Sequence, residues 1–205
     1  MTDPLDSVRA YFSRRMKEHG SSPRGVDWNT VEAQELRFAQ VMNVRDHDGP
    51  FTLVDWGCGY GALYDFLKRY GLPFTYVGYD ITPPALMRAR TDHPGVMFVG
   101  GENEIPECEF VVASGVFNIK LDTSADAWRD FVHDQLKRMF AKATRGIAST
   151  FLTTYSDPPK RRPDLFYADP LQLFDFAKRE LSPNVALLHD YGHWDFTLVV
   201  RKAAP

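Results

Sequence analysis

The sequence predicts an α/β fold: a single doubly wound sheet of seven strands, mostly parallel with an antiparallel last strand, preceded by N-terminal helices. Three observations support this prediction. A mostly apolar run at 51–54 leads through an acid and a glycine-rich loop into a helix-forming segment. Strand-like and helix-like runs then alternate, as they do in βαβ units. The last two strand-like runs are separated only by 190–193, so they must pair antiparallel.

Length and composition fit one globular domain. The chain has 205 residues, of which 44% are apolar and 25% charged. Its net charge of −3 provides no general attraction to nucleic acid or to an anionic membrane, and no apolar run is long enough to cross a bilayer. The first residues lack the features of a signal peptide. Cys58 and Cys108 lie far apart, so we expect reduced thiols and a cytoplasmic protein.

Two helices are expected before the first strand. Apolar residues recur at helical spacing over 5–19, and a Gly-Ser-Ser-Pro segment ends this run. Asn29 is placed to cap a second helix, with Glu32 reaching back as in a capping box. That helix is expected to run to about Asn43. A polar link at 46–50 then leads into the first strand.

The remaining elements follow the alternating pattern. The expected strands are 51–55, 74–79, 96–99, 110–113, 147–152, 185–189 and 194–200. The expected helices are 62–70, 82–92, 124–143 and one that opens at 169. Thr82 and Asp169 are typical N-caps, and each is followed by a proline suited to the first turn. Gly146 is expected to end the long helix, and the proline-rich segment 153–163 is a candidate lid over a substrate.

The glycine-rich loop is the strongest functional signal in the sequence. It reads Asp55-Trp56-Gly57-Cys58-Gly59-Tyr60-Gly61 and directly precedes a helix. Glycines allow left-handed backbone angles and let a ligand lie against the main chain. The N–H groups of the helix N-terminus point into the same crevice. The loop therefore predicts a ligand site at the carboxyl end of the first strand.

Two classes of ligand compete for this loop. Gly57-x-Gly59-x-x-Ala62 fits a dinucleotide fingerprint, and Asp80 follows at a suitable distance. Asp55, however, places a carboxylate just before the glycines, where it would repel a pyrophosphate. The same carboxylate would attract a ligand that carries an ammonium and a sulfonium. We therefore favour the cationic ligand.

The segment Asp55-x-Gly57-x-Gly59-x-Gly61 resembles motif I of the class I S-adenosylmethionine (SAM)-dependent methyltransferases. The run 75–81, which ends in Asp80-Ile81, resembles the second strand of that family. The resemblance covers 51 to about 201 and implies a Rossmann-like methyltransferase fold with SAM as cofactor. It also implies that the loop cradles the methionine end of SAM and that Asp80 accepts hydrogen bonds from the ribose hydroxyls.

The same resemblance suggests further cofactor contacts. An acid or amide after the third strand would meet the adenine, which points to Glu102 or Asn103. Ser114 and Gly115 would lie beside the glycine loop. The residues expected at the cofactor are Asp55, Gly57, Cys58, Gly59, Gly61, Asp80, Ile81, Glu102, Ser114 and Gly115.

The acceptor pocket is predicted from segments near the sheet's carboxyl end. In the resembled family a segment before the first strand often closes over the cofactor, so we expect 1–50 to form a helical cap over a catalytic domain at 51–205. The residues expected to bind the substrate are Trp28, Arg37, Phe117, Tyr155 and Tyr167. Aromatic walls with one cationic anchor suit a planar or acidic small molecule.

The function predicted is methyl transfer to a small molecule, with an O- or carboxyl-directed reaction favoured. Asn118 is not followed by the Pro-Pro-aromatic sequence of many amino-methylating enzymes. No carboxylate pair with an Asn suggests a magnesium site, so we expect no metal, and the pattern singles out no catalytic residue. Nucleic-acid and membrane partners are not expected. The alternatives are an NAD-type oxidoreductase and a methyltransferase-like binding module without catalysis.

Overall fold

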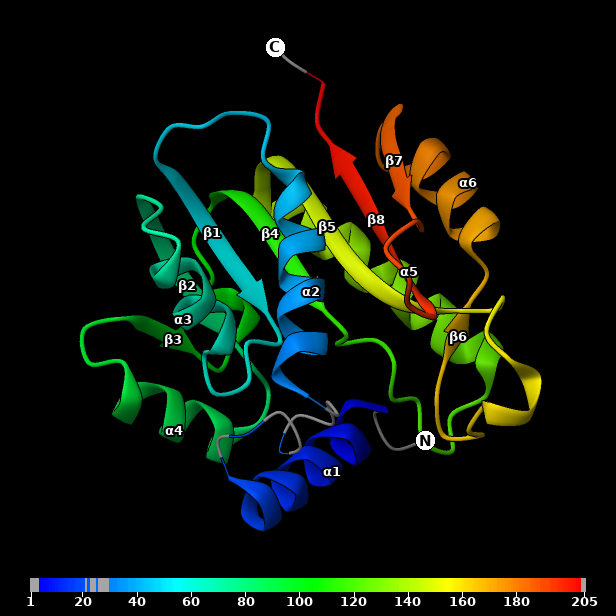
Figure 1. Ribbon diagram of the computed structural model, residues 1–205, viewed down its shortest axis with the longest axis horizontal. Helices are drawn as coiled ribbons and strands as arrows, with labels where there is room; N and C mark the ends of the chain where they lie inside the picture. The colour runs from blue at the N-terminus through cyan, green and yellow to red at the C-terminus, as the bar shows by residue number, and fades with distance from the viewer. Residues whose placement is uncertain (1–3, 21, 23–24, 26–29, 204–205) are drawn as a thin grey trace.

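One central sheet runs through the molecule, with helices on both of its faces (Figure 1). The computed structural model describes residues 4–20, 22, 25 and 30–203. Its strands are β1 (Phe51–Trp56), β2 (Phe74–Tyr79), β3 (Met97–Val99), β4 (Cys108–Ser114), β5 (Ala143–Thr153), β6 (Tyr167–Ala168), β7 (Asn184–Leu188) and β8 (Asp195–Arg201). They follow the order β3-β2-β1-β4-β5-β8-β7, and the two-residue β6 pairs with β5. Because β8 runs antiparallel to both neighbours while the other strand pairs are parallel, the predicted fold class is confirmed.

The helices divide between the two faces of the sheet. They are α1 (Pro4–His19), α2 (Val31–Val41), α3 (Ala62–Arg69), α4 (Pro83–Asp92), α5 (Ala125–Lys142) and α6 (Pro170–Glu180). Side chains of α2, α3 and α4 form one buried apolar cluster with one face of the sheet. Side chains of α5 and α6 form a second cluster with the opposite face. Alternate residues of each central strand therefore enter different cores, which explains the continuous apolar runs in the sequence.

Two local predictions need correction. Asn29 lies outside the described residues, and the N-cap of α2 is Thr30, whose hydroxyl oxygen accepts from the Ala33 N–H at 3.1 Å. Gly146 does not end a helix but lies inside β5, which begins directly after α5. A Cβ on Gly146 would lie 2.8 Å from the Val200 carbonyl oxygen. The glycine therefore serves the close approach of β8 and not helix termination.

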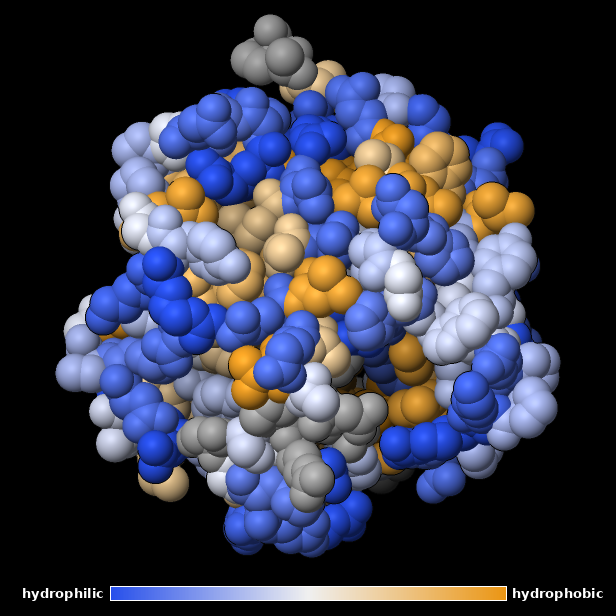
Figure 2. Space-filling model, in the orientation of Figure 1, coloured by the Kyte–Doolittle hydropathy of each residue, from blue (hydrophilic) through white to orange (hydrophobic). Residues whose placement is uncertain are grey.

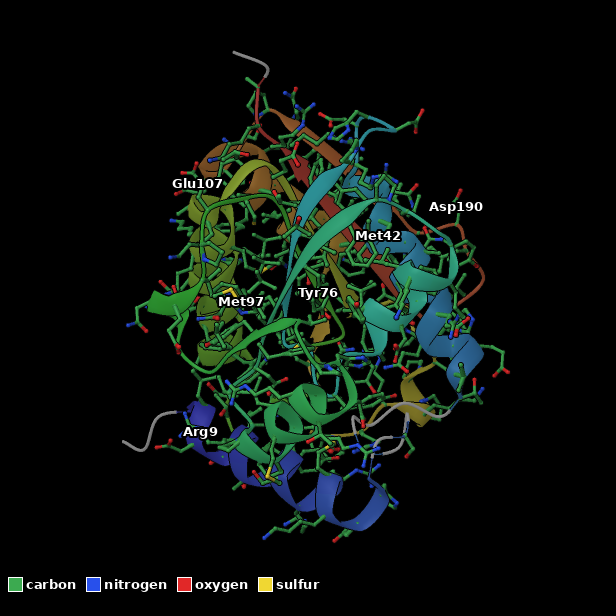
Figure 3. All side chains as sticks on the ribbon, turned by 90° about the vertical axis from the view of Figure 1, so that its left-hand side faces the viewer. Arg9, Met42, Tyr76, Met97, Glu107 and Asp190 are labelled. Atoms are coloured by element: carbon green, nitrogen blue, oxygen red, sulfur yellow. The ribbon has the colours of Figure 1, made fainter. Side chains whose placement is uncertain are left out.

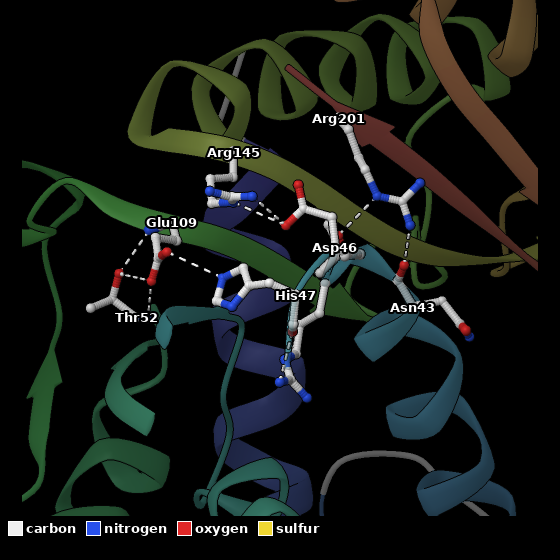
Figure 4. Close-up of polar contacts among 9 residues, drawn as sticks. Asn43, Asp46, His47, Thr52, Glu109, Arg145 and Arg201 are labelled. Atoms are coloured by element: carbon white, nitrogen blue, oxygen red, sulfur yellow. Dashed lines mark hydrogen bonds and ion pairs between the residues drawn. The ribbon is translucent and has the colours of Figure 1, made fainter. Parts of the chain in front are cut away.

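Helix α2 is held by two side-chain contacts with β8. Within the helix, Arg37 donates to the buried carboxylate of Asp195, the first residue of β8. Just beyond its C-terminal end, Arg201 donates to two backbone carbonyls of the turn (Met42–Val44) that follows α2. Arg145 pairs with Asp46 at 2.8 Å in the link to β1 (Figure 4). These contacts join the segment before β1 to the far half of the sheet.

Helix α1 lies across the carboxyl ends of the central strands and packs against α4 (Figure 1). Its Arg9 donates to the Ile81 carbonyl oxygen at 3.1 Å, and Figure 3 shows Arg9 below the sheet in which Tyr76 lies. On the face that carries α2, apolar side chains gather over β7, whose residues 185–188 are half-buried (Figure 2). Among the described helices, none has the length and apolar character needed to span a membrane.

Candidate functional site

A cavity lies between α1 and the carboxyl ends of β1, β2 and β4. Most residues predicted at the cofactor line it, namely Asp55, Gly57, Cys58, Gly59, Asp80, Ile81, Ser114 and Gly115. Gly61 and Glu102 are not among the lining residues. Gly61 is the N-cap of α3, with a φ of 92°. Glu102 is paired with Arg138 of α5 at 3.2 Å.

Asp55 provides a carboxylate at the floor of this cavity. Its side chain is only 3% exposed, and Tyr76 Oη donates to Asp55 Oδ2 at 2.7 Å. Burial raises the pKa of Asp55 to about 7, although the Tyr76 hydrogen bond opposes the shift and the nearby Asp80 adds to it. A cation bound here would favour the ionised carboxylate and be held by it.

The glycine loop is held close to β2. The N–H groups of Gly57 and Cys58 both donate to the Tyr79 carbonyl oxygen, at 2.7 and 2.9 Å. Gly57 has a φ of 81°, and a Cβ at this position would lie 2.5 Å from Val116 Cγ2. Any larger residue would therefore be strained and would push into the loop that follows β4.

Asp80 accepts two backbone hydrogen bonds at the end of β2. Its Oδ2 accepts from the Gly59 N–H at 2.8 Å and its Oδ1 from the Thr82 N–H at 2.7 Å. Burial raises the pKa of Asp80, and the two backbone donors oppose that shift. Each carboxylate oxygen keeps a further lone pair. The group is thus fixed in place and can still accept hydrogen bonds from a pair of hydroxyl groups.

Cys58 and Ser114 are two further polar residues of the cavity lining. The Cys58 thiol packs beside Gly78, where a Cβ would lie 2.8 Å from the sulfur. Burial, together with the charges of Asp80 and Asp55, raises the pKa of this thiol well above its ordinary value, so it stays protonated. Ser114 Oγ is buried and has no hydrogen-bond partner among the described residues. A ligand that reaches Ser114 would satisfy that hydroxyl.

The cavity wall opposite the loop is apolar. Leu5, Val8, Phe12 and Met16 line it from one face of α1. Buried carboxylates, a glycine cradle and an unpartnered hydroxyl are the groups that a cationic, hydroxyl-bearing ligand requires. The residues present therefore fit SAM.

The residues predicted for the substrate do not gather in one place. Among the described residues Phe117 lines the cavity and is 1% exposed. Trp28 lies outside the described residues. Arg37 is buried against Asp195 and does not line the cavity. Tyr155 and Tyr167 do not line the cavity either.

Both tyrosines lie near the carboxyl end of β5. Tyr155 is 61% exposed, and its ring centroid lies 5.9 Å from that of His189. Tyr167 accepts a hydrogen bond from the Arg162 N–H at 3.0 Å and lines a second cavity between α5 and α6. Tyr167 pairs in β6 with Leu152 near the carboxyl end of β5 and does not line the first cavity.

Several lining residues on α5 were not predicted, namely Trp128, Phe131 and Gln135. From the other side of the sheet, Gln34 of α2 also lines the cavity. Trp128 and Phe131 belong to the apolar stripe of the long helix, which the sequence predicts only as core. The spacing of Trp128, Phe131 and Gln135, at three and seven residues, marks one helix face and is the signal available in the sequence.

Comparisons with known proteins give the family. No protein-family model matches the chain. A protein of Mycobacterium tuberculosis strain H37Rv, named "Putative methyltransferase Rv1506c", is 40% identical over 168 residues, which cover 80% of this chain and 99% of that protein. The chain belongs to the class I SAM-dependent methyltransferases. The methyl donor of the enzyme is thus SAM, which decides against the dinucleotide.

Solved structures show the same fold at low sequence identity. The magnesium protoporphyrin IX methyltransferase of Synechocystis PCC 6803, with bound SAM, is 13% identical with a TM-score of 0.62 and covers 99% of each chain. Human N-acetylserotonin methyltransferase, in complex with SAM, is 14% identical with a TM-score of 0.65, covering 99% of this chain and 60% of that one. The fold of this methyltransferase is thus shared with proteins that differ from it in most residues.

Proposed function

We propose that this methyltransferase transfers the methyl group of SAM to a small-molecule acceptor, with oxygen or a carboxyl group as the favoured target. The observation that supports a small acceptor is the mostly apolar lining of the cavity. The cavity lies between α1 and the strand ends, and the aromatic side chains of Phe117, Trp128 and Phe131 line it. An acceptor that enters such a space is small and at least partly apolar.

The cofactor roles follow from the groups described above. Asp55 would hold the ammonium of the methionyl moiety, and the glycine loop would cradle that moiety with Ser114 and Gly115. Asp80 would accept from the ribose hydroxyls. SAM supplies an activated methyl group on a positively charged sulfur when bound.

The contribution of the chain itself is alignment and exclusion of water. The apolar face of α1 would cover the reacting atoms, and the walls would hold the acceptor in line with the sulfur. A carboxylate acceptor needs no general base, whereas a protonated hydroxyl does. We assign residues 1–50 to a cap and 51–205 to the catalytic domain, with α1 as the part of the cap that covers the cavity.

The comparisons agree with this proposal. The two solved neighbours are named for the acceptors magnesium protoporphyrin IX and N-acetylserotonin, both of which are small molecules. The net charge of −3 gives no general attraction to a nucleic-acid acceptor.

Incubation with methyl-labelled SAM and a fractionated cell extract tests the proposal. We expect label in the small-molecule fraction with the wild-type enzyme and not with Asp80→Ala. Mild alkali then distinguishes the target, because a methyl ester releases volatile methanol while an ether keeps its label. Label confined to protein or nucleic acid, or a wild-type enzyme that does not bind SAM, would refute the proposed function.

A further inference from the structure

The side chain of Gln135 is a polar group without a use in the fold. It lies on α5, is 8% exposed and lines the first cavity. No hydrogen bond within the described part of the chain reaches its carboxamide. The carboxamide atoms are not among the fully buried unpartnered atoms, so they are accessible from the cavity. An amide on a cavity wall with no partner in this part of the protein is free to form hydrogen bonds with a ligand.

The neighbours of Gln135 place it at one end of the cavity. Trp128 Nε1 donates to the Phe117 carbonyl oxygen at 2.8 Å, which ties that turn of α5 to the exit of β4. Arg138, one turn beyond Gln135, pairs with Glu102 just after β3. Trp128 and Gln135 are seven residues apart, or about 10 Å along the helix axis. Gln135 is thus the end of the lining stripe nearest the β3 side.

The strand order then indicates which part of SAM lies near Gln135. The sheet runs β3-β2-β1-β4, with the glycine loop after β1, Ser114 at the end of β4 and Asp80 directly after β2. The proposed site places the methionyl moiety between β1 and β4 and the ribose on Asp80. The adenine, which is attached to the ribose, would then lie towards β3. Tyr79 and Ile81, which flank Asp80 at the end of β2, also line the cavity.

The hydrogen-bonding groups of adenine and of the Gln135 carboxamide are complementary. The edge of adenine carries an amine donor beside a ring-nitrogen acceptor, and a carboxamide carries an acceptor beside donors. The acid expected for this role, Glu102, is engaged by Arg138 and lies off the cavity. We propose that Gln135 recognises the adenine edge of SAM. This inference rests on the proposed function, since it requires SAM in this cavity.

The inference is tested by comparing the binding of two ligands to the wild-type enzyme and to one variant, as in a double-mutant cycle. The ligands are S-adenosylhomocysteine and its analogue with purine in place of adenine, which lacks the exocyclic amine. Calorimetry should show that the wild-type enzyme binds the analogue about tenfold more weakly, which is the size of one neutral hydrogen bond. In Gln135→Met, which keeps the length of the side chain but not its amide, that ratio should fall to about one.

Gln34→Met is the matched control. It removes an amide from the opposite side of the same cavity, where Gln34 accepts from Tyr60 Oη at 3.4 Å, so the tenfold ratio should persist. A ratio that also persists in Gln135→Met overturns the inference and leaves the proposed function standing. Equal binding of both ligands by the wild-type enzyme overturns it without any variant. Failure of the wild-type enzyme to bind S-adenosylhomocysteine overturns the proposed function and the inference together.

Discussion

Replacement of Asp55 by Asn should make the ligand-free enzyme more stable and its complex with SAM weaker. Asp55 is buried, and its carboxylate has one hydrogen bond, from Tyr76 Oη. An Asn oxygen can accept the same bond without carrying a charge. The variant therefore removes the cost of a buried charge in the empty site, together with the charge that would hold the cofactor.

The magnitude follows from the pKa of Asp55, which burial raises from 3.8 to about 7. One pKa unit corresponds to about 1.4 kcal/mol. Because the folded pKa is the higher one, the carboxyl group's contribution to stability is complete below pH 4 and is lost as the pH rises through 7. Asn does not titrate, so Asp55→Asn should gain up to about 4 kcal/mol over the wild-type enzyme at pH 8. The advantage should shrink towards pH 5.

Urea denaturation of the ligand-free proteins at pH 5, 6, 7 and 8 measures this difference, and calorimetry at pH 8 measures the loss of SAM affinity. Asp175→Asn is the control, because Asp175 is exposed and forms only a surface ion pair with Arg179. That variant should change stability little at any pH. An Asp55→Asn variant less stable than wild type at pH 8, or an advantage that does not depend on pH, would contradict the reasoning.

Three further predictions concern the same loop and its neighbours. Asp80→Asn should weaken SAM by about 1–3 kcal/mol in calorimetry, because charge-assisted hydrogen bonds are lost; an unchanged Kd would refute the ribose role. Gly57→Ala should lower both the Tm and the affinity for SAM, given the positive φ and the Cβ position 2.5 Å from Val116 Cγ2. Addition of Val116→Ala should restore part of that loss, and no recovery would show that strain at Gly57 dominates. Iodoacetamide should label Cys58 and Cys108 slowly in the folded protein, since burial raises both pKa values; rapid labelling of Cys58, seen by mass spectrometry, would mean that the loop opens readily.

The sequence predicted those parts of the fold that depend on local pattern. The apolar run before the glycine loop, the strand ending before Asp80 and the hairpin around 190–193 are each encoded within a few residues, and the structure has all three. Asp169 caps α6 as expected, accepting from the Leu171 and Gln172 N–H groups. Such features need only neighbouring residues to form.

The features that local pattern did not predict depend on distant contacts. Gly146 is needed for the approach of β8, which begins 49 residues further along the chain at Asp195. Arg37 and Asp195 are 158 residues apart, so the sequence shows each as an isolated charge. Glu102 follows β3 as expected, but its carboxylate forms an ion pair with Arg138 of α5. Only tertiary packing decides which charged groups face a cavity and which face each other.

Because Arg37 and the turn after α2 both contact β8, a truncated chain must keep that helix. Removal of residues 1–29 would strip one wall from the cavity but leave these contacts intact. A cut at residue 50 would instead take Arg37 away from Asp195, which lies 1% exposed at the start of β8, and an unmatched buried charge is strongly destabilising. A fragment that begins at residue 30 should thus stay folded, whereas one that begins at residue 51 should not, and urea denaturation of the two fragments measures the difference.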